Sequence, residues 1–158
     1  MEIPSLAQLK KELSYLSEKE LIELVADLAK FSRENKAYLY FKLNEKVQPG
    51  LFGDTVKEDL EESFQTANLK NYHLAKKSAQ GIRRKLNKAL KLSKNKADQA
   101  ELILYFCEKL KQYGYLKFRH PVIQKLYELQ LQKAEKLIEK LEEDLQYDLG
   151  QILESLKT

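Results

Sequence analysis

The stretch ELILYFCEKLKQYG, residues 101–114, decides the fold that the sequence predicts. Its residues 102–107 form an unbroken apolar run, and Gly114 stands where a left-handed residue commonly ends a helix. Asp98, a few residues earlier, is suited to open the same helix. A helix that is apolar on most of its sides has to be covered by neighbouring helices. The stretch therefore predicts a central, buried helix with other helices packed around it.

The N-terminal part of the chain carries two helix-start signals. The sequences SLAQ at 5–8 and SEKE at 17–20 are capping boxes, in which a hydroxyl and a longer side chain satisfy free N–H groups of the first turn. They predict helices over about 6–16 and 18–33, joined as a hairpin. One face of each helix is apolar, at Leu9, Leu13 and Leu16 and at Leu21, Leu24, Val25, Leu28 and Phe31. A third, short helix is expected at 36–44.

The rest of the chain begins with the clearest loop, QPGLFGDT at 48–55, because its proline and two glycines break regular structure. The helices expected after this loop run over about 56–68, 72–94, 98–113 and 122–147. Pro121 suits the first turn of the last of these, where its missing N–H costs nothing. Gly150 either ends this long helix or separates a last short helix over 151–156.

The pattern as a whole predicts an all-α fold of about seven helices, either a bundle or a short solenoid-like array of antiparallel helical hairpins. We expect one domain over 1–158, with a hairpin at 5–44, a loop at 45–54 and the remaining helices at 55–158. The longest runs without a charged residue have seven residues, far below the ~20 that a membrane span requires. A single cysteine and the lack of an apolar signal core suggest a cytoplasmic protein.

Charge is distributed unevenly, although the net charge is only +4. Residues 63–97 carry ten basic and no acidic side chains, whereas 1–62 and 134–158 each have a net charge of −4. On the helix at 72–94, one arc holds seven of the cations, Lys76, Lys77, Arg83, Arg84, Lys88, Lys91 and Lys94. This arc is a candidate polyanion-binding face, and the alternative is that it is solvated or paired with acidic neighbours. No aromatic residue lies among these cations.

Gly81 lies on the wet side of the same helix, where glycine is less favourable than alanine. One interpretation is a bend or break of the helix near 80–82. The other is that the missing side chain lets the backbone or phosphate of a partner approach between Lys77 and Arg84.

Enzymatic chemistry is not expected, because the groups that would carry it lack the required pattern. His73 and His120 are the only histidines and neither has a metal-binding spacing, so we expect no metal and no cofactor. Cys107 lies in the apolar run, where a thiol is buried and inert. The carboxylates at 61–62 and 142–144 are expected on solvated helix surfaces, since adjacent helical residues point about 100° apart.

The aromatic residues Tyr113, Tyr115 and Phe118 cluster around Gly114. They are the candidate lining of a partner groove, because aromatic side chains often anchor interfaces. The alternative is that they belong to the core or its boundary, with hydroxyls that reach the surface.

Five segments of the chain are leucine-patterned helices, LKKELSYLSEKELIELVADL (9–28), YFKLN (40–44), AKKSAQGIRRKL (75–86), ELILYFCEKLKQYG (101–114) and KAEKLIEKL (133–141). In these segments the chain resembles a family of small bacterial helical proteins classified only as a domain of unknown function. The resemblance implies a helical fold, and it implies no catalytic or ligand residues.

A non-enzymatic helical protein-protein interaction or scaffold module is the function that these patterns favour. Self-association is expected through the apolar stripe at 134–156, although folding back onto the domain would use the same stripe. The alternative function is nucleic-acid binding through the basic amphipathic helix at 72–94. A small-molecule ligand between helices would leave no trace in the sequence.

Overall fold

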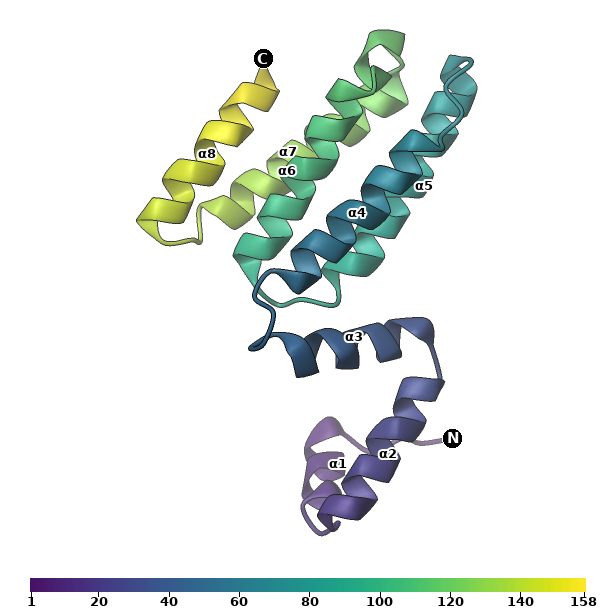
Figure 1. Cartoon of the computed structure of the whole chain (residues 1–158), viewed down its shortest axis with the longest axis vertical. Helices are drawn as coiled ribbons and strands as arrows, with labels where there is room; N and C mark the ends of the chain where they lie inside the picture. The colour runs from purple at the N-terminus through teal and green to yellow at the C-terminus, as the bar shows by residue number, and fades with distance from the viewer. The chain divides into compact units, whose positions relative to one another are not determined.

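The computed structural model describes residues 1–158 and contains eight α-helices, one 3-10 helix and no strand (Figure 1). The predicted all-α fold is confirmed, and the number of helices is close to the expected seven. The chain forms two compact units, unit 1 over Met1–Leu43 and unit 2 over Asn44–Thr158. None of the helices combines the length and the apolar composition that crossing a membrane would require.

Helix α6 (Lys96–Gln112) is the central helix of unit 2, as its apolar run predicts. It packs against α4 (Leu51–Gln65), α5 (Tyr72–Leu90), η1 (Tyr115–Phe118), α7 (Pro121–Ile138) and α8 (Glu143–Lys157). Five of the six residues at 102–107 are buried. The helix begins before the expected Asp98, because the Asn95 side chain accepts from the N–H groups of Ala97 and Asp98 at 2.9 and 3.2 Å. Gly114, with φ of 81°, follows its end as predicted.

Helix α4 begins at Leu51, five residues before the position that the sequence predicted. Gly50 precedes it with φ of 85°, a left-handed conformation that glycine adopts without steric cost. Gly53 lies inside the first turn of the helix, where glycine lowers helix stability without preventing helix formation. The loop predicted at 48–55 was therefore too long. Val56, Leu60 and Phe64 recur every fourth residue and form the buried face of α4.

The long helix predicted over 122–147 is in fact two helices, α7 and α8, separated by a turn at 139–142. The Gln146 side chain of α8 donates a hydrogen bond to the Glu139 carbonyl at 3.0 Å and so satisfies an orphan acceptor at the end of α7. Gly150 does not end a helix but lies inside α8. Leucine periodicity continues across the turn, which is why the sequence concealed it.

Helix α8 folds back onto α6 and α7. Its residues Leu149, Leu153 and Leu156 are buried in the core of unit 2. The Tyr127 hydroxyl of α7 donates to the Leu156 carbonyl at 2.6 Å, which secures the last turn of α8. The apolar stripe at 134–156 thus serves packing within unit 2, the second of the two uses that the sequence allowed.

Unit 1 contains α1 (Leu6–Leu13), α2 (Glu18–Lys30) and α3 (Arg33–Asn44), whose last residue opens unit 2. The capping box at 5–8 is confirmed by hydrogen bonds in both directions between Ser5 and Gln8, at 3.1 and 3.3 Å. Ser17 caps α2 by accepting from the Glu20 N–H at 3.2 Å. Helices α1 and α2 each end three residues before the predicted position, and no residue of α1, α2 or α3 is buried.

Candidate functional site

The basic arc lies on α5, a continuous helix whose first turn is capped by Asn71. The Asn71 side chain accepts from the Leu74 N–H at 2.9 Å. One side of the helix is buried against the core through Ala75, Ala79, Ile82, Leu86 and Leu90. The helix is not interrupted at Gly81, so the break that was one interpretation of this glycine is absent. Helix α5 ends four residues before the predicted position.

The seven cations of the arc differ in exposure. Lys77, Arg84, Lys88, Lys91 and Lys94 are exposed, and Lys76 and Arg83 are half-buried. At about 100° per residue, four of the exposed cations fall within an arc of about 60° on the side opposite the buried stripe. These four, called the basic row below, are Lys77, Arg84, Lys88 and Lys91.

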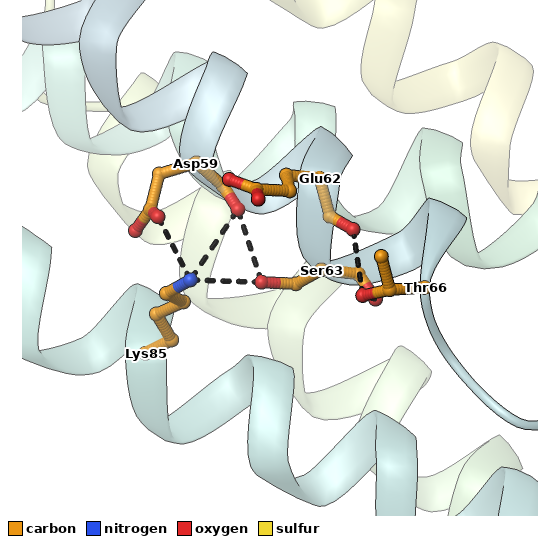
Figure 2. Close-up of polar contacts among 5 residues, drawn as sticks. All are labelled: Asp59, Glu62, Ser63, Thr66 and Lys85. Carbon is orange, nitrogen blue, oxygen red and sulfur yellow. Dashed lines mark hydrogen bonds and ion pairs between the residues drawn. The ribbon is translucent and has the colours of Figure 1, made fainter.

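Lys85, which the helical projection places off the basic arc, is a cation of α5 that reaches α4 (Figure 2). Its ammonium lies 2.8 Å from the Asp59 carboxylate and donates to the Ser63 hydroxyl at 2.9 Å. The hydroxyls of Ser63 and Thr66 in turn donate to carbonyls of α4, those of Asp59 and Glu62. The side chains of the ion pair are 42% and 52% exposed, so the pair adds at most about 1 kcal/mol. It ties α5 to α4 without involving the basic row.

The side chains of three members of the basic row, Lys77, Arg84 and Lys91, form no ion pair or hydrogen bond in the structure. Four of the five acidic residues of α4 line a depression of about 470 Å³ together with Tyr105 of α6. These four are Asp54, Glu58, Glu61 and Glu62. Lys85 thus pairs with Asp59 of α4, whereas the side chains of Lys77, Arg84 and Lys91 do not pair with α4.

Glu61 is the best-anchored carboxylate of this depression. It accepts from the hydroxyls of Tyr113 at 2.6 Å and Tyr105 at 3.1 Å and forms an ion pair with Lys109 at 2.9 Å. These bonds, the one from Tyr113 foremost, lower the pKa of Glu61 to about 2. Burial is the main reason that the pKa of Tyr105 rises to about 12. The cluster thus joins α4 to α6 and is not poised for proton transfer near neutral pH.

The sequence predicted a solvated carboxylate at Glu61, and this prediction was wrong. Its side chain is 24% exposed, and its tyrosine partners lie 44 and 52 residues further along the chain. Sequence spacing within one helix carries no signal for contacts at such separations. A signal was available in α6 itself, because Tyr105 brings a hydroxyl into the apolar run and a tyrosine hydroxyl usually finds a hydrogen-bond partner when it is buried.

The predicted aromatic groove exists in part. Tyr113 and Phe118 line a depression of about 320 Å³ together with Leu69, Gly114 and Lys117. Tyr115, predicted to line the groove as well, is instead 0% exposed, and its hydroxyl lies 2.8 Å from the Ser78 hydroxyl. Tyr115 follows the left-handed Gly114 and opens the 3-10 turn η1, which directs its ring into the core against Phe64.

The remaining reactive side chains occupy structural positions. Cys107 is buried, and burial raises the pKa of its thiol to about 12, so the thiol stays protonated at neutral pH. His120 caps α7 by accepting from the Val122 N–H at 3.1 Å, and its ring stacks on Tyr72. His73 is exposed. No group of three or more His, Cys, Asp or Glu side chains is placed to hold a metal ion.

Unit 1 presents an apolar surface that the sequence interpretation had assigned to packing within the hairpin. None of its 43 residues is buried. Leu24, Val25, Leu28 and Phe31 of the predicted apolar face are 39%, 43%, 48% and 77% exposed. The sequence signal that could have revealed this surface is length, because about 40 residues rarely suffice to enclose a core.

No protein-family model matches the chain, and searches of curated proteins and of solved structures found no significant match.

Proposed function

We propose that this chain is a helical protein-protein interaction module that forms a dimer through unit 1. The observation that supports the proposal is the contrast between the two units. Unit 2 encloses a continuous apolar core, whereas unit 1 forms three helices and buries no side chain. A partner that covers the apolar side chains of unit 1 would supply the missing hydrophobic contacts.

The size of unit 1 is the first argument for association. Segments of about 40 residues seldom fold alone unless a disulfide, a metal or oligomerisation stabilises them. Unit 1 contains no cysteine, and no cluster of metal-binding side chains occurs in the chain. Of these three means of stabilising a small segment, oligomerisation is the one that unit 1 can use.

Charge favours a second copy of the same chain as the partner. Unit 1 carries seven basic and seven acidic side chains, so two copies do not repel each other. The charges are also separated between helices, since α2 holds four acidic and two basic residues and α3 holds three basic and one acidic. A twofold axis that brings α2 of one copy beside α3 of the other makes these charges complementary.

A matched pair of substitutions tests the proposal. Leu28 in unit 1 and Leu129 in α7 are both 48% exposed, so Leu28→Glu and Leu129→Glu make the same change to equally exposed leucines. We expect the wild-type protein to be a dimer at micromolar concentration by sedimentation equilibrium. Leu28→Glu should weaken the dimer by about tenfold or more, because it places a charge in a desolvated interface. Leu129→Glu should leave it unchanged.

Two results would contradict the proposal. One is a wild-type protein that remains monomeric at the highest concentrations that sedimentation can examine. The other is a dimer that Leu129→Glu weakens as much as Leu28→Glu does, since the interface would then lie outside unit 1. Far-ultraviolet circular dichroism of both variants shows whether the helices are retained.

A further inference from the structure

We propose that the basic row of α5 binds the phosphate backbone of a nucleic-acid duplex without reading its base sequence. This activity is separate from the association through unit 1 and does not depend on it. The inference rests on the geometry of the row, on the side chains around it and on the position of Gly81.

The basic row has the length and charge of a phosphate-binding edge. Lys77 and Lys91 are fourteen positions apart, which corresponds to about 21 Å along an α-helix. One strand of a duplex presents about six phosphates over that distance. The side chains of Lys77, Arg84 and Lys91 have no partner within the protein, so contact of these three cations with phosphates would not require breaking an internal ion pair.

The side chains next to the basic row indicate which class of anionic partner it fits. Apart from Tyr72 at its first residue, α5 exposes no large apolar side chain. Protein interfaces centre on buried apolar or aromatic anchors, and membrane-surface helices insert an apolar face, so both need groups that the row lacks. Single-stranded nucleic acid is held by aromatic side chains on which bases stack, and none lies on the row. A duplex backbone needs cations alone.

Gly81 supplies an independent indication. It lies one turn from both Lys77 and Arg84, and the Arg84 guanidinium passes close to it. A Cβ added at Gly81 would meet nothing nearer than the Arg84 Nη2 atom, at 3.8 Å, which is an ordinary contact. The fold therefore does not require glycine here, although glycine weakens a helix relative to alanine. Glycine at this position lets a sugar-phosphate backbone approach the helix more closely than a residue with a side chain would.

The nearby acidic side chains do not oppose this binding mode. Four carboxylates of α4 line the depression with Tyr105, Glu61 among them is bonded to residues of α6, and Asp59 is paired with Lys85. Within α5 there is no acidic residue. A phosphate backbone along the row would thus meet cations, a histidine at position 73 and small polar groups.

Fluorescence anisotropy with labelled duplexes of arbitrary sequence, one of DNA and one of RNA, tests the proposal. If four phosphates are contacted, wild-type affinity should fall about a hundredfold between about 50 and about 200 mM salt. The triple variant Lys77→Gln, Arg84→Gln, Lys91→Gln should bind at least about tenfold more weakly at the lower salt and lose most of this salt dependence. Binding to one duplex but not the other supports the proposal and identifies the nucleic acid.

The control removes the same charge from another face of unit 2. Lys125, Lys133 and Lys136 are exposed lysines of α7, and their replacement by glutamine should change affinity by about twofold or less. The proposal is overturned by undetectable binding of both duplexes at low salt, or by equal losses in the two triple variants. Tighter binding of polyglutamate, of anionic vesicles or of a single strand than of either duplex would overturn it too.

Discussion

At the scale of single residues, Glu61 is the side chain whose environment makes the clearest prediction. Its folded-state pKa of about 2 lies below the ordinary value of 4.5, so the folded protein binds this proton more weakly than the unfolded chain does. The contribution of Glu61 to stability is therefore complete above pH of about 5 and is lost as the pH falls toward about 2. Glu61→Gln should lower the free energy of unfolding by about 1 to 3 kcal/mol at pH 7, because Lys109 and two hydroxyls lose a charged acceptor.

Urea unfolding at pH 7 and near pH 2 measures this effect. The difference between wild type and Glu61→Gln should shrink at the lower pH, where the wild-type carboxyl is itself becoming protonated. Glu62 is the natural control, since it is the next residue of the same helix and is exposed. Glu62→Gln should change the free energy of unfolding by less than about 0.5 kcal/mol. A Glu61→Gln effect that is the same at both pH values would show that the ionised form is not the stabilising one.

At the scale of a helix, Gly81 makes α5 less stable than it would be with alanine at this position. Gly81→Ala should raise the free energy of unfolding by about 0.5 to 1 kcal/mol, because alanine loses less backbone entropy and the added methyl has room. Under the duplex-binding proposal the same substitution should weaken binding, since the methyl group lies where the backbone approaches. Thermal unfolding and fluorescence anisotropy measure the two effects separately.

Gly150 provides the matching control for this substitution. It lies inside α8, and a Cβ added there would have nothing within 4 Å. Gly150→Ala should stabilise the protein to a similar degree and leave duplex affinity unchanged. If Gly81→Ala stabilises the protein without affecting duplex binding, the glycine has no part in the approach of a partner.

The starts of α1 and α2 were predictable from the sequence, whereas their ends were not. Ser5 and Ser17 mark the beginnings of α1 and α2 because their hydroxyls satisfy N–H groups a few residues away. Local chemistry of this kind can be read from spacing. The starts of α4 and α8 could not be read in this way, since Gly50 and Glu142 make no side-chain capping bond.

Contacts between helices set the limit for the candidate sites. The shared outward side of Lys77, Arg84 and Lys91 follows from helical periodicity alone, and the sequence predicted it. Whether those cations stay unpaired depends on where α4 directs its carboxylates, which is a property of tertiary packing. The burial of Tyr115 depends likewise on a turn that follows a left-handed glycine. Helical periodicity shows which residues share a face of a helix, but it does not show which other elements cover that face.

At the scale of the whole molecule, the two units should differ in how their stability responds to concentration. Unit 2 has its own core, so its amide protection is a property of one chain. If unit 1 is covered by a second copy, its protection is linked to association by mass action and increases with protein concentration. Hydrogen exchange measured by mass spectrometry separates these cases at two concentrations about a hundredfold apart, one below and one above the dissociation constant of the dimer, because the population of dimer changes across that constant.

Peptides from residues 1–43 should exchange more slowly at the higher concentration, and peptides from α6 should exchange at the same rate at both. Leu28→Glu should remove the concentration dependence of unit 1, whereas the equally exposed Leu129→Glu should retain it. Protection of unit 1 that is equal at both concentrations would mean that its apolar side chains are covered within a single chain. Rapid exchange of unit 1 at both concentrations would mean that nothing covers them, because three helices without a buried side chain have little to hold them closed.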